Sequence, residues 1–366
     1  MDFLKKYESF IFKNATQVSS IESTLRSLTY ILPGRFDDAD LASEALFSTL
    51  NLLGIYHDTI LTKHVASLPA THRPTPSTLN RYTRDWQNSS VAYRRIVLLL
   101  TVIQYTEVLI EMSVQKKWGQ KYKWRVITAL ETIKAAGRLG LMRLTNNRML
   151  MHPVHTERDV DPSKLADIAE AQLAVKESHW TGSRTGSSRL QLSAVQKSSG
   201  KAGKNSDVTD FLLSKVLTPD VVRQPRDLVS KLTGLGAVGE YLFILRPVIY
   251  VLAMRKYGQK SWYPWFLSLS IELVSRTSIK HYLAGRAAAG GRGASGTPLE
   301  KDEMKRRLWL LLYYVLRSPF YDQFTKERLD NFCESASKKP LISLVGGIVR
   351  DYQPLWESVY FYTAGS

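Results

Sequence analysis

The chain is poor in cysteine, in long uncharged apolar runs and in the alternating pattern of a strand. Its single cysteine, Cys333, excludes a framework of intramolecular disulfides and suits a reducing compartment. Uncharged apolar-rich runs reach only about eleven residues, below the eighteen or so that identify a spanning helix by composition alone. No alternation of polar and apolar residues is long enough to build a sheet. The chain is therefore predicted to be almost entirely α-helical.

Motifs that would indicate catalysis or a bound cofactor are lacking as well. Residues 234–239 match the Gly-x-Gly-x-x-Gly dinucleotide fingerprint, but neither a buried strand before them nor an acidic residue about 20 positions later is present. We interpret them as a flexible lead into the next helix. The pair His152 and His155 has no cysteine or carboxylate cluster beside it, so no metal site is predicted. We expect no catalytic residues, no cofactor and no enzymatic activity.

An excess of positive charge is the first positive feature. The net charge of +17 requires an anionic partner, and nucleic acid and anionic lipid are the usual candidates. The basic stretches lack a recognition helix or an RNA-binding motif, so no nucleic acid is expected. A basic nucleic-acid-binding helical protein remains an alternative.

Two similar basic and aromatic turns favour a membrane surface. Residues 116–121 (KKWGQK) and 255–260 (RKYGQK) each follow one apolar run and precede another. Aromatic rings and basic groups together are typical of the boundary between lipid tails and headgroups. The predicted interface anchors are Trp118, Lys121, Trp124, Tyr257, Lys260, Trp262 and Trp265.

The first hairpin carries charges inside its apolar helices. Residues 96–115 would span about 30 Å as a helix, but the apolar gain and the cost of Glu107 and Glu111 nearly cancel. Lys134 and Arg138 form a comparable stripe on the helix predicted over 124–142. We hypothesise that Glu107 or Glu111 pairs with Lys134 or Arg138, because unpaired charges in lipid are costly. The alternative is that both stripes face water on a peripheral bundle.

The predicted organisation is one all-α, membrane-associated bundle with two apolar helical hairpins and long flexible loops. The second hairpin is expected to be broken at Arg246-Pro247 and at Pro264, and so to lie shallowly in the interface. Ser318-Pro319 is expected to open a helix, and Pro354 to break the last one. The segments are N-terminal amphipathic helices (1–90), the first hairpin (91–150), a flexible basic loop (151–235), the second hairpin (236–283), a Gly-rich loop (284–300) and C-terminal helices with an aromatic tail (301–366).

Several of these stretches resemble the peroxin 16 family of peroxisome-biogenesis membrane proteins, as a fungal-type member. They are 28–36 (LTYILPGRF), 51–61 (NLLGIYHDTIL), Glu107 and Glu111 with Trp118-Gly119, 240–247 (EYLFILRP), 257–265 (YGQKSWYPW), 310–322 (LLLYYVLRSPFYD) and 360–362 (YFY). The signature residues are Gly34, Arg35, Phe36, Arg246, Pro247, Arg317, Ser318, Pro319, Phe320 and Tyr321. The resemblance lapses over 153–230 and 284–299.

The resemblance implies a protein of the peroxisomal membrane, routed in some members through the endoplasmic reticulum membrane. It implies a role in inserting other peroxisomal membrane proteins by docking peroxin 3 and, through it, peroxin 19 with cargo. Membrane lipid is the other expected partner. On this basis the hairpins would seat the protein, and the N-terminal helices and C-terminal tail would form the docking face. The alternatives are a peripheral regulator of peroxisome division and an acyl-lipid or transport activity that uses Glu107 and Glu111.

Overall fold

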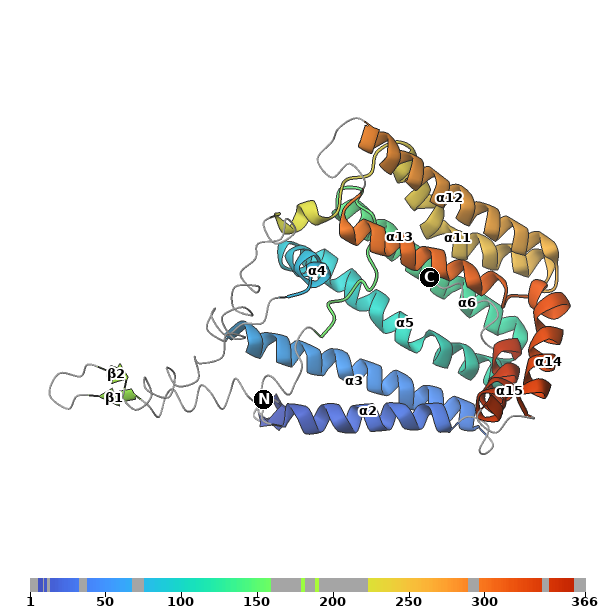
Figure 1. Cartoon of the computed structure of the whole chain (residues 1–366), viewed down its shortest axis with the longest axis horizontal. Coiled ribbons are helices and arrows are strands. Elements are labelled where there is room, and N and C mark those ends of the chain that lie inside the picture. The colour runs from blue at the N-terminus through green and yellow to red at the C-terminus, as the bar shows by residue number, and fades with distance from the viewer. Residues whose placement is uncertain are drawn as a thin grey trace. The chain divides into compact units, whose positions relative to one another are not determined.

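The computed structural model confirms the all-α class (Figure 1). It describes residues 6–8, 10–11, 14–32, 38–67, 76–158, 179–181, 188–190, 223–288, 296–337 and 342–358. The helices are α2 (Ala15–Ile31), α3 (Ala39–Ser67), α4 (Thr78–Ser89), α5 (Val91–Trp118), α6 (Gln120–Leu144), α11 (Leu235–Tyr257), α12 (Trp262–Ala288), α13 (Pro298–Leu310), α14 (Lys326–Ser337) and α15 (Ile342–Ser358). Shorter elements are the 3-10 turns η2 (Pro225–Leu228) and η3 (Leu311–Tyr314), the π-helical turn η4 (Tyr321–Thr325), and the strands β1 (His179–Thr181) and β2 (Ser188–Leu190).

The chain divides into two units. The first comprises Met1–Thr24, Gly54–Thr78 and Glu157–Gln224, and the second comprises Leu25–Leu53, Leu79–Thr156 and Pro225–Ser366. In the first unit, Arg158 forms ion pairs with Asp58 (2.5 Å) and Glu22 (3.4 Å). Its antiparallel ribbon, with Trp180 opposite Arg189, lies in the predicted basic loop. The helix expected around 164–176 lies outside the described residues.

Local signals in the second unit explain where its helices begin and end. Ser90 caps α5 by accepting a hydrogen bond from the Tyr93 amide (3.3 Å). Thr297 and Glu300 form a reciprocal capping box at the start of α13, and Pro298 follows the cap, where its missing N–H costs nothing.

The two hairpins, α5–α6 and α11–α12, pack together through α6 and α11, which run antiparallel. Near the turns Ile127 packs with Val251, and near the opposite ends Tyr241 donates a hydrogen bond to Asn147 (3.3 Å). Both hairpin turns therefore lie at the same end of the unit, as Figure 1 shows. Helix α13 also contacts α11, through the contacts of Arg307 described below.

The expected proline breaks are wrong. Pro247 lies inside a continuous α11, Pro264 lies in the first turn of α12, and α15 continues through position 354. A proline in a first turn costs no hydrogen bond. Pro247 does remove one, but it is buried and α11 packs against both α6 and α12, which outweighs the local loss. The second hairpin is therefore as continuous as the first.

Candidate membrane-facing surface and buried charge network

The two hairpin turns share one geometry. Gly119 and Gly258 have φ of +81° and +86°, a region that favours glycine. Their amides donate to the carbonyls of Gln115 and Met254 (3.0 and 2.9 Å), closing the last turn of α5 and of α11. Lys117 lies 5.1 Å from the centroid of the Trp118 ring, and the equivalent distance from Lys256 to Tyr257 is 5.2 Å. Each turn presents a cation stacked on an aromatic ring.

The predicted interface anchors do not all lie on the surface. Trp118 and Tyr257 are 56% and 46% exposed, and Lys121 and Lys260 are exposed as well. Trp124 and Trp262 are half-buried. Trp265 differs from the expectation, since it is buried, donates its indole N–H to the Tyr314 carbonyl (3.0 Å) and stacks on Phe320. It braces α12 against the segment after α13 because its polar N–H finds a buried partner there.

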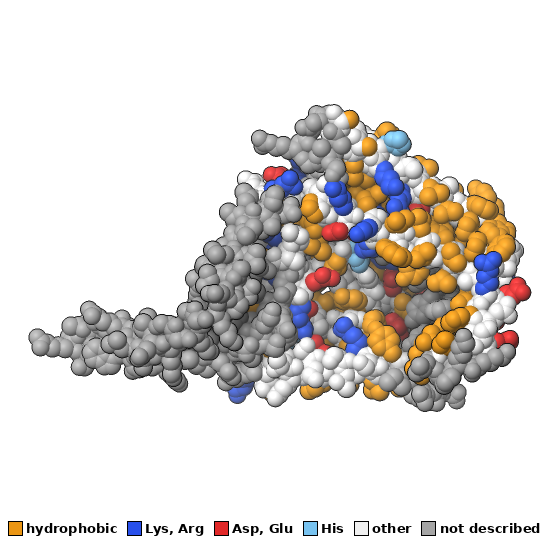
Figure 2. Space-filling view, viewed as in Figure 1, with side chains coloured by type: hydrophobic (Ala, Val, Ile, Leu, Met, Phe, Trp, Pro, Cys, Tyr) orange, Lys and Arg blue, Asp and Glu red, His pale blue; other side chains and the backbone are white. Residues whose placement is uncertain are grey.

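The outward faces of the hairpins are apolar over most of their length. Two of the described helices, α5 and α11, are long and apolar enough to cross a membrane. Large exposed side chains on α5, α11 and α12 are Leu98, Leu99, Val102, Val238, Leu245, Leu252, Tyr263, Phe266, Leu273 and Val274. Figure 2 shows hydrophobic side chains gathered on the right of the view, where Figure 1 draws the end of α11 and the start of α12.

The charged groups of the first hairpin point into the bundle. Lys134 binds Glu107 (2.6 Å) and Glu131 (2.7 Å), so the structure joins one of the pairs that the sequence suggested. Glu111, which is fully buried, pairs instead with Lys123 (2.9 Å), a residue that the sequence reasoning missed. Arg138 forms no hydrogen bond or ion pair with any residue that the structure describes.

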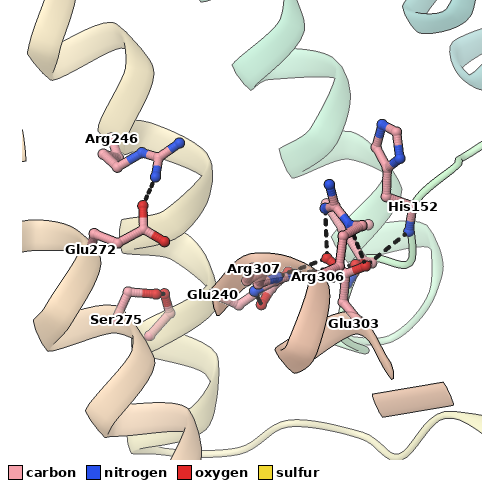
Figure 3. Close-up of polar contacts among 10 residues, drawn as sticks. His152, Glu240, Arg246, Glu272, Ser275, Glu303, Arg306 and Arg307 are labelled. Atoms are coloured by element: carbon pink, nitrogen blue, oxygen red, sulfur yellow. Dashed lines mark hydrogen bonds and ion pairs between the residues drawn. The ribbon is translucent and has the colours of Figure 1, made fainter. Parts of the chain in front are cut away.

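The second hairpin holds a larger buried network, drawn in Figure 3. Arg246 of α11 forms an ion pair with Glu272 of α12, and both are almost fully buried. Arg307 of α13 binds both oxygens of Glu240 (2.7 and 2.8 Å) and one oxygen of Glu303 (2.8 Å). Glu240 also accepts a hydrogen bond from the backbone amide of Leu150 (3.1 Å). This network fastens α13 and the segment after α6 to α11.

Glu303 lies at the edge of this network. It accepts two hydrogen bonds from Arg306 (2.8 and 2.9 Å) in addition to the one from Arg307. Burial alone would raise the pKa of Glu303, but the two guanidinium groups outweigh that effect and lower it to about 2. Nearby, burial and then the charge of Arg306 lower the pKa of His152 to about 4. Glu303 is therefore ionised and His152 neutral at physiological pH.

The signature residues around 317–321 are structural. The Arg317 guanidinium lies over the rings of Tyr314 (4.7 Å) and Tyr250 (5.1 Å), which joins this segment to α11. Ser318 and Pro319 precede η4, and the Ser318 hydroxyl donates to Asp322 (2.7 Å). Phe320 is half-buried and Tyr321 fully buried. Gly34, Arg35 and Phe36, like the tail from 359, lie outside the described residues.

The glycines at 234–239 pack helices and are not a flexible lead. Gly234 precedes α11 with φ of +52°, and Gly236 and Gly239 lie in its first turns. A Cβ on Gly239 would come within 2.8 Å of the Ser275 carbonyl oxygen, and one on Gly236 within 2.7 Å of the Tyr282 ring. These glycines let α11 and α12 approach closely, as small residues do in membrane helix pairs. Among the described residues, no group of His, Cys, Asp or Glu could hold a metal ion.

Comparison with known proteins gives a match over nearly the whole chain. The family model described as "Peroxisomal membrane protein (Pex16)" matches residues 5–358. This chain belongs to the Pex16 family. Family members with curated names include "Peroxisome biogenesis protein 16" of Arabidopsis thaliana, which is 27% identical over 99% of this chain and 100% of its own length.

Two further relatives cover different shares of this chain. "Peroxisome biogenesis factor 16" of Dictyostelium discoideum is 41% identical over 35% of this chain and 31% of its own length. "Peroxisomal membrane protein PEX16" of Schizosaccharomyces pombe is 22% identical over 88% of this chain and 86% of its own length. No solved structure matches the chain.

Proposed function

We propose that this peroxisome-biogenesis protein is seated in the peroxisomal membrane through its two hairpins and recruits other membrane proteins to it. Recruitment is proposed to occur by docking peroxin 3 and, through it, peroxin 19 with its cargo. The proposal includes passage of the protein through the endoplasmic reticulum membrane before it reaches the peroxisome. The family supports the peroxisomal membrane, and the surfaces of the hairpins support the mode of seating.

The observation that carries the proposal is the inverted polarity of the hairpins. Glu111 and Glu240 are completely buried and Arg246 is 2% exposed, whereas Leu99 and Phe266 are 49% and 57% exposed. A bundle in water places such side chains the other way round. Ionisable groups within membrane helices face the bundle interior and pair with one another, as these do.

The spacing of exposed basic residues supports a spanning arrangement. Lys116 lies about 31 Å along α5 from Arg95, and Lys280 lies about 27 Å along α12 from Trp262, two residues after Lys260, at 1.5 Å per residue. Between these positions α5 exposes no charged side chain, and the charged residues of α12 are the buried Glu272 and the half-buried Arg276. The hydrocarbon core of a bilayer is about 30 Å thick, so the two basic ends match its two surfaces.

Exposed apolar side chains outside the hairpins support a docking role. Helix α2 exposes Ile21 and Tyr30 (60% and 61%), and α15 exposes Leu344 and Ile348 (72% and 52%). Exposed apolar clusters of this kind mark surfaces that bind proteins or membranes. We assign them to partner docking because they lie outside the two hairpins.

Alkaline carbonate extraction with protease protection of tagged termini tests the seating. The protein should remain in the membrane pellet, and release by carbonate would favour a peripheral regulator of division. Leu273→Lys places a charge within the apolar span of α12 and should make the protein extractable, since such a charge costs about 2.5–3.5 kcal/mol. His281→Lys, exposed at the end of α12, is the matched control and should stay in the pellet.

Deletion of residues 1–60 tests the docking face separately. The truncated protein should still resist carbonate extraction, because both hairpins remain, and should no longer recruit peroxin 3 to isolated membranes. Release of the truncated protein from membranes would show that the N-terminal helices are the membrane anchor and would overturn this assignment.

A further inference from the structure

A small cavity lies between α6, α11, α13 and the segment that follows α6. Its volume is about 30 Å³, and its walls are largely apolar, with Leu141, Met151 and Phe243 among them. Three guanidinium groups, those of Arg138, Arg306 and Arg307, line it against one carboxylate, that of Glu303. Figure 3 shows Arg306, Glu303 and His152 together beside α13.

Two of the three arginines already have carboxylate partners. Arg307 is shared between Glu240 and Glu303, and Arg306 donates twice to Glu303. Arg138 has no hydrogen bond or ion pair with the described part of the chain. The acidic groups that act on it electrostatically, Glu131 and Glu107, are both bound to Lys134. One guanidinium on the cavity wall is thus left to bind an external anion.

His152 adds a neutral hydrogen-bonding group to this cavity. Its imidazole lines the cavity and, as described above, is neutral at physiological pH. A neutral imidazole can donate one hydrogen bond to an anion without competing for charge. The backbone amide of His152 donates a hydrogen bond to Glu303 (3.4 Å), which holds the backbone of this segment beside the arginines.

The position of the cavity along the helices indicates what the anion belongs to. Arg138 lies about 27 Å along α6 from Gln120, and Glu240 about 25 Å along α11 from Tyr257. If the basic turns lie at one membrane surface, as proposed above, the cavity lies near the other surface, at the depth of the lipid phosphates. This step rests on the proposed seating of the hairpins.

We propose that Arg138, with Arg306 and Arg307 beside it, forms a binding site for the phosphate group of an anionic phospholipid. Guanidinium groups bind phosphate oxygens in a bidentate manner, and several arginines favour phosphate over a singly charged carboxylate. A cavity of about 30 Å³ admits roughly two water-sized groups, so phosphate oxygens enter while the glycerol and acyl chains remain outside. The apolar wall meets the carbon atoms next to the phosphate.

The test uses full-length protein in phosphatidylcholine nanodiscs with and without phosphatidic acid, and measures bound phosphatidic acid by native mass spectrometry. Arg138→Gln should weaken its retention about tenfold, because one charge-assisted hydrogen-bond pair is lost. Arg143→Gln removes an exposed arginine from the same end of α6 and should retain phosphatidic acid like the wild type. Equal losses in the two variants would show non-specific attraction and overturn the proposal, as would unchanged retention in Arg138→Gln.

Two further arms separate the possible sources of failure. In detergent without phosphatidic acid, Arg138→Gln should unfold at the wild-type temperature or above, because removing a half-buried charge that has no ion-pair partner among the described residues is not destabilising. A clear drop would assign Arg138 a structural role and overturn the site. If glycerol phosphate displaced phosphatidic acid at equal concentration, the site would recognise phosphate alone, and the proposal that it binds a lipid would be overturned. Carbonate extraction of wild-type protein reads out the seating independently, and Arg138→Gln should not change it.

Discussion

The two hairpins have the same turn and the same continuous helices but neutralise their buried charges differently. In α5–α6 the ion-pair partners of Glu107 and Glu111 among the described residues, Lys134 and Lys123, come from the hairpin itself. In α11–α12 the charge of Glu240 is met by Arg307, which belongs to α13. The buried carboxylates of the first hairpin are thus neutralised within it, and Glu240 of the second depends on a helix that follows it in the chain.

This difference indicates an order of assembly. A hairpin whose carboxylates pair internally can bury them as soon as its two helices meet, which fits the cost of unpaired charges in lipid. The second hairpin is complete only when α13 has packed, so C-terminal folding is coupled to it. The largest effects of mutation are therefore expected where α11 meets α13.

Removing Arg307 should have the largest effect on stability, because the second hairpin depends on it. Arg307→Met leaves Glu240 buried without a counter-ion and should cost about 3–5 kcal/mol of stability. The expected result is a large fall in thermal unfolding temperature in detergent, with early proteolysis around α13. Arg306→Gln is the control, because Arg306 is half-buried and binds Glu303 but not Glu240, so Glu240 keeps its partner. Equal stability of the two variants would show that α13 does not support the second hairpin.

Lys123→Met tests the neutralisation of a carboxylate within the first hairpin. It leaves Glu111 unpaired and should cost about 3 kcal/mol, read out as a lower unfolding temperature without early cleavage around α13. The double variant Lys123→Met with Glu111→Gln should recover most of the loss, because the uncompensated charge is removed with its partner. If the double variant stays as unstable as the single one, the 2.9 Å pair is not what stabilises this hairpin.

The closeness of the helices gives a third contrast. In α11–α12, Gly239→Ala would push a Cβ against the Ser275 carbonyl and should destabilise the protein by about 1–3 kcal/mol. In α5–α6, a Cβ on Gly140 meets only the end of Ile96 at 3.4 Å, so Gly140→Ala should be neutral or stabilising by up to about 1 kcal/mol. Thermal unfolding of both variants in one detergent compares them. A harmless Gly239→Ala would mean that the second hairpin is no more closely packed than the first.

The cluster at the α13 end should also make the second hairpin sensitive to acid. His152 has a folded pKa of about 4 against an ordinary 6.5, so the unfolded chain binds this proton first as the pH falls. The stability from His152 is complete above pH 6.5 and is lost between pH 6.5 and 4, a change of roughly 2 kcal/mol after allowance for solvent. Glu303 adds a loss between pH 4.5 and 2. His152→Asn should flatten the upper window of an unfolding titration, and an unchanged titration would contradict this origin.

Much of this could be predicted from the sequence because the signals are local. The all-α class follows from composition and periodicity, the twin turns from their Gly-Gln-Lys pattern, and the contact of Glu107 with Lys134 from stripes on two neighbouring helices. A lone acid in an apolar run is costly wherever it occurs, so Glu240, like Glu107, is expected to have a buried basic partner. The Glu303 and Arg307 pair, four residues apart, could have been found in the same way.

Other features depend on contacts between distant segments and could not be read locally. The bond between Glu240 and Arg307 joins residues far apart in the chain, and no spacing indicates it. Proline normally breaks a helix interior, yet packing on both faces of α11 outweighs the lost hydrogen bond at Pro247. Trp265 follows a basic and aromatic turn, which predicted an interface anchor, but it is buried against Tyr314 and Phe320. In each case tertiary packing decides against the local preference.

The smallest effect is expected at the feature that the hairpins share. Trp118→Ala and Tyr257→Ala each remove an exposed ring and its contact with the neighbouring lysine, and each should weaken binding to anionic liposomes by at most about 1 kcal/mol. Trp118→Tyr makes the first turn resemble the second and should be close to neutral. Because the two turns do not contact each other through these rings, the double alanine variant should show the sum of the single effects. A much larger loss from one alanine variant than from the other, measured by liposome flotation, would show that only one hairpin anchors the protein at this surface.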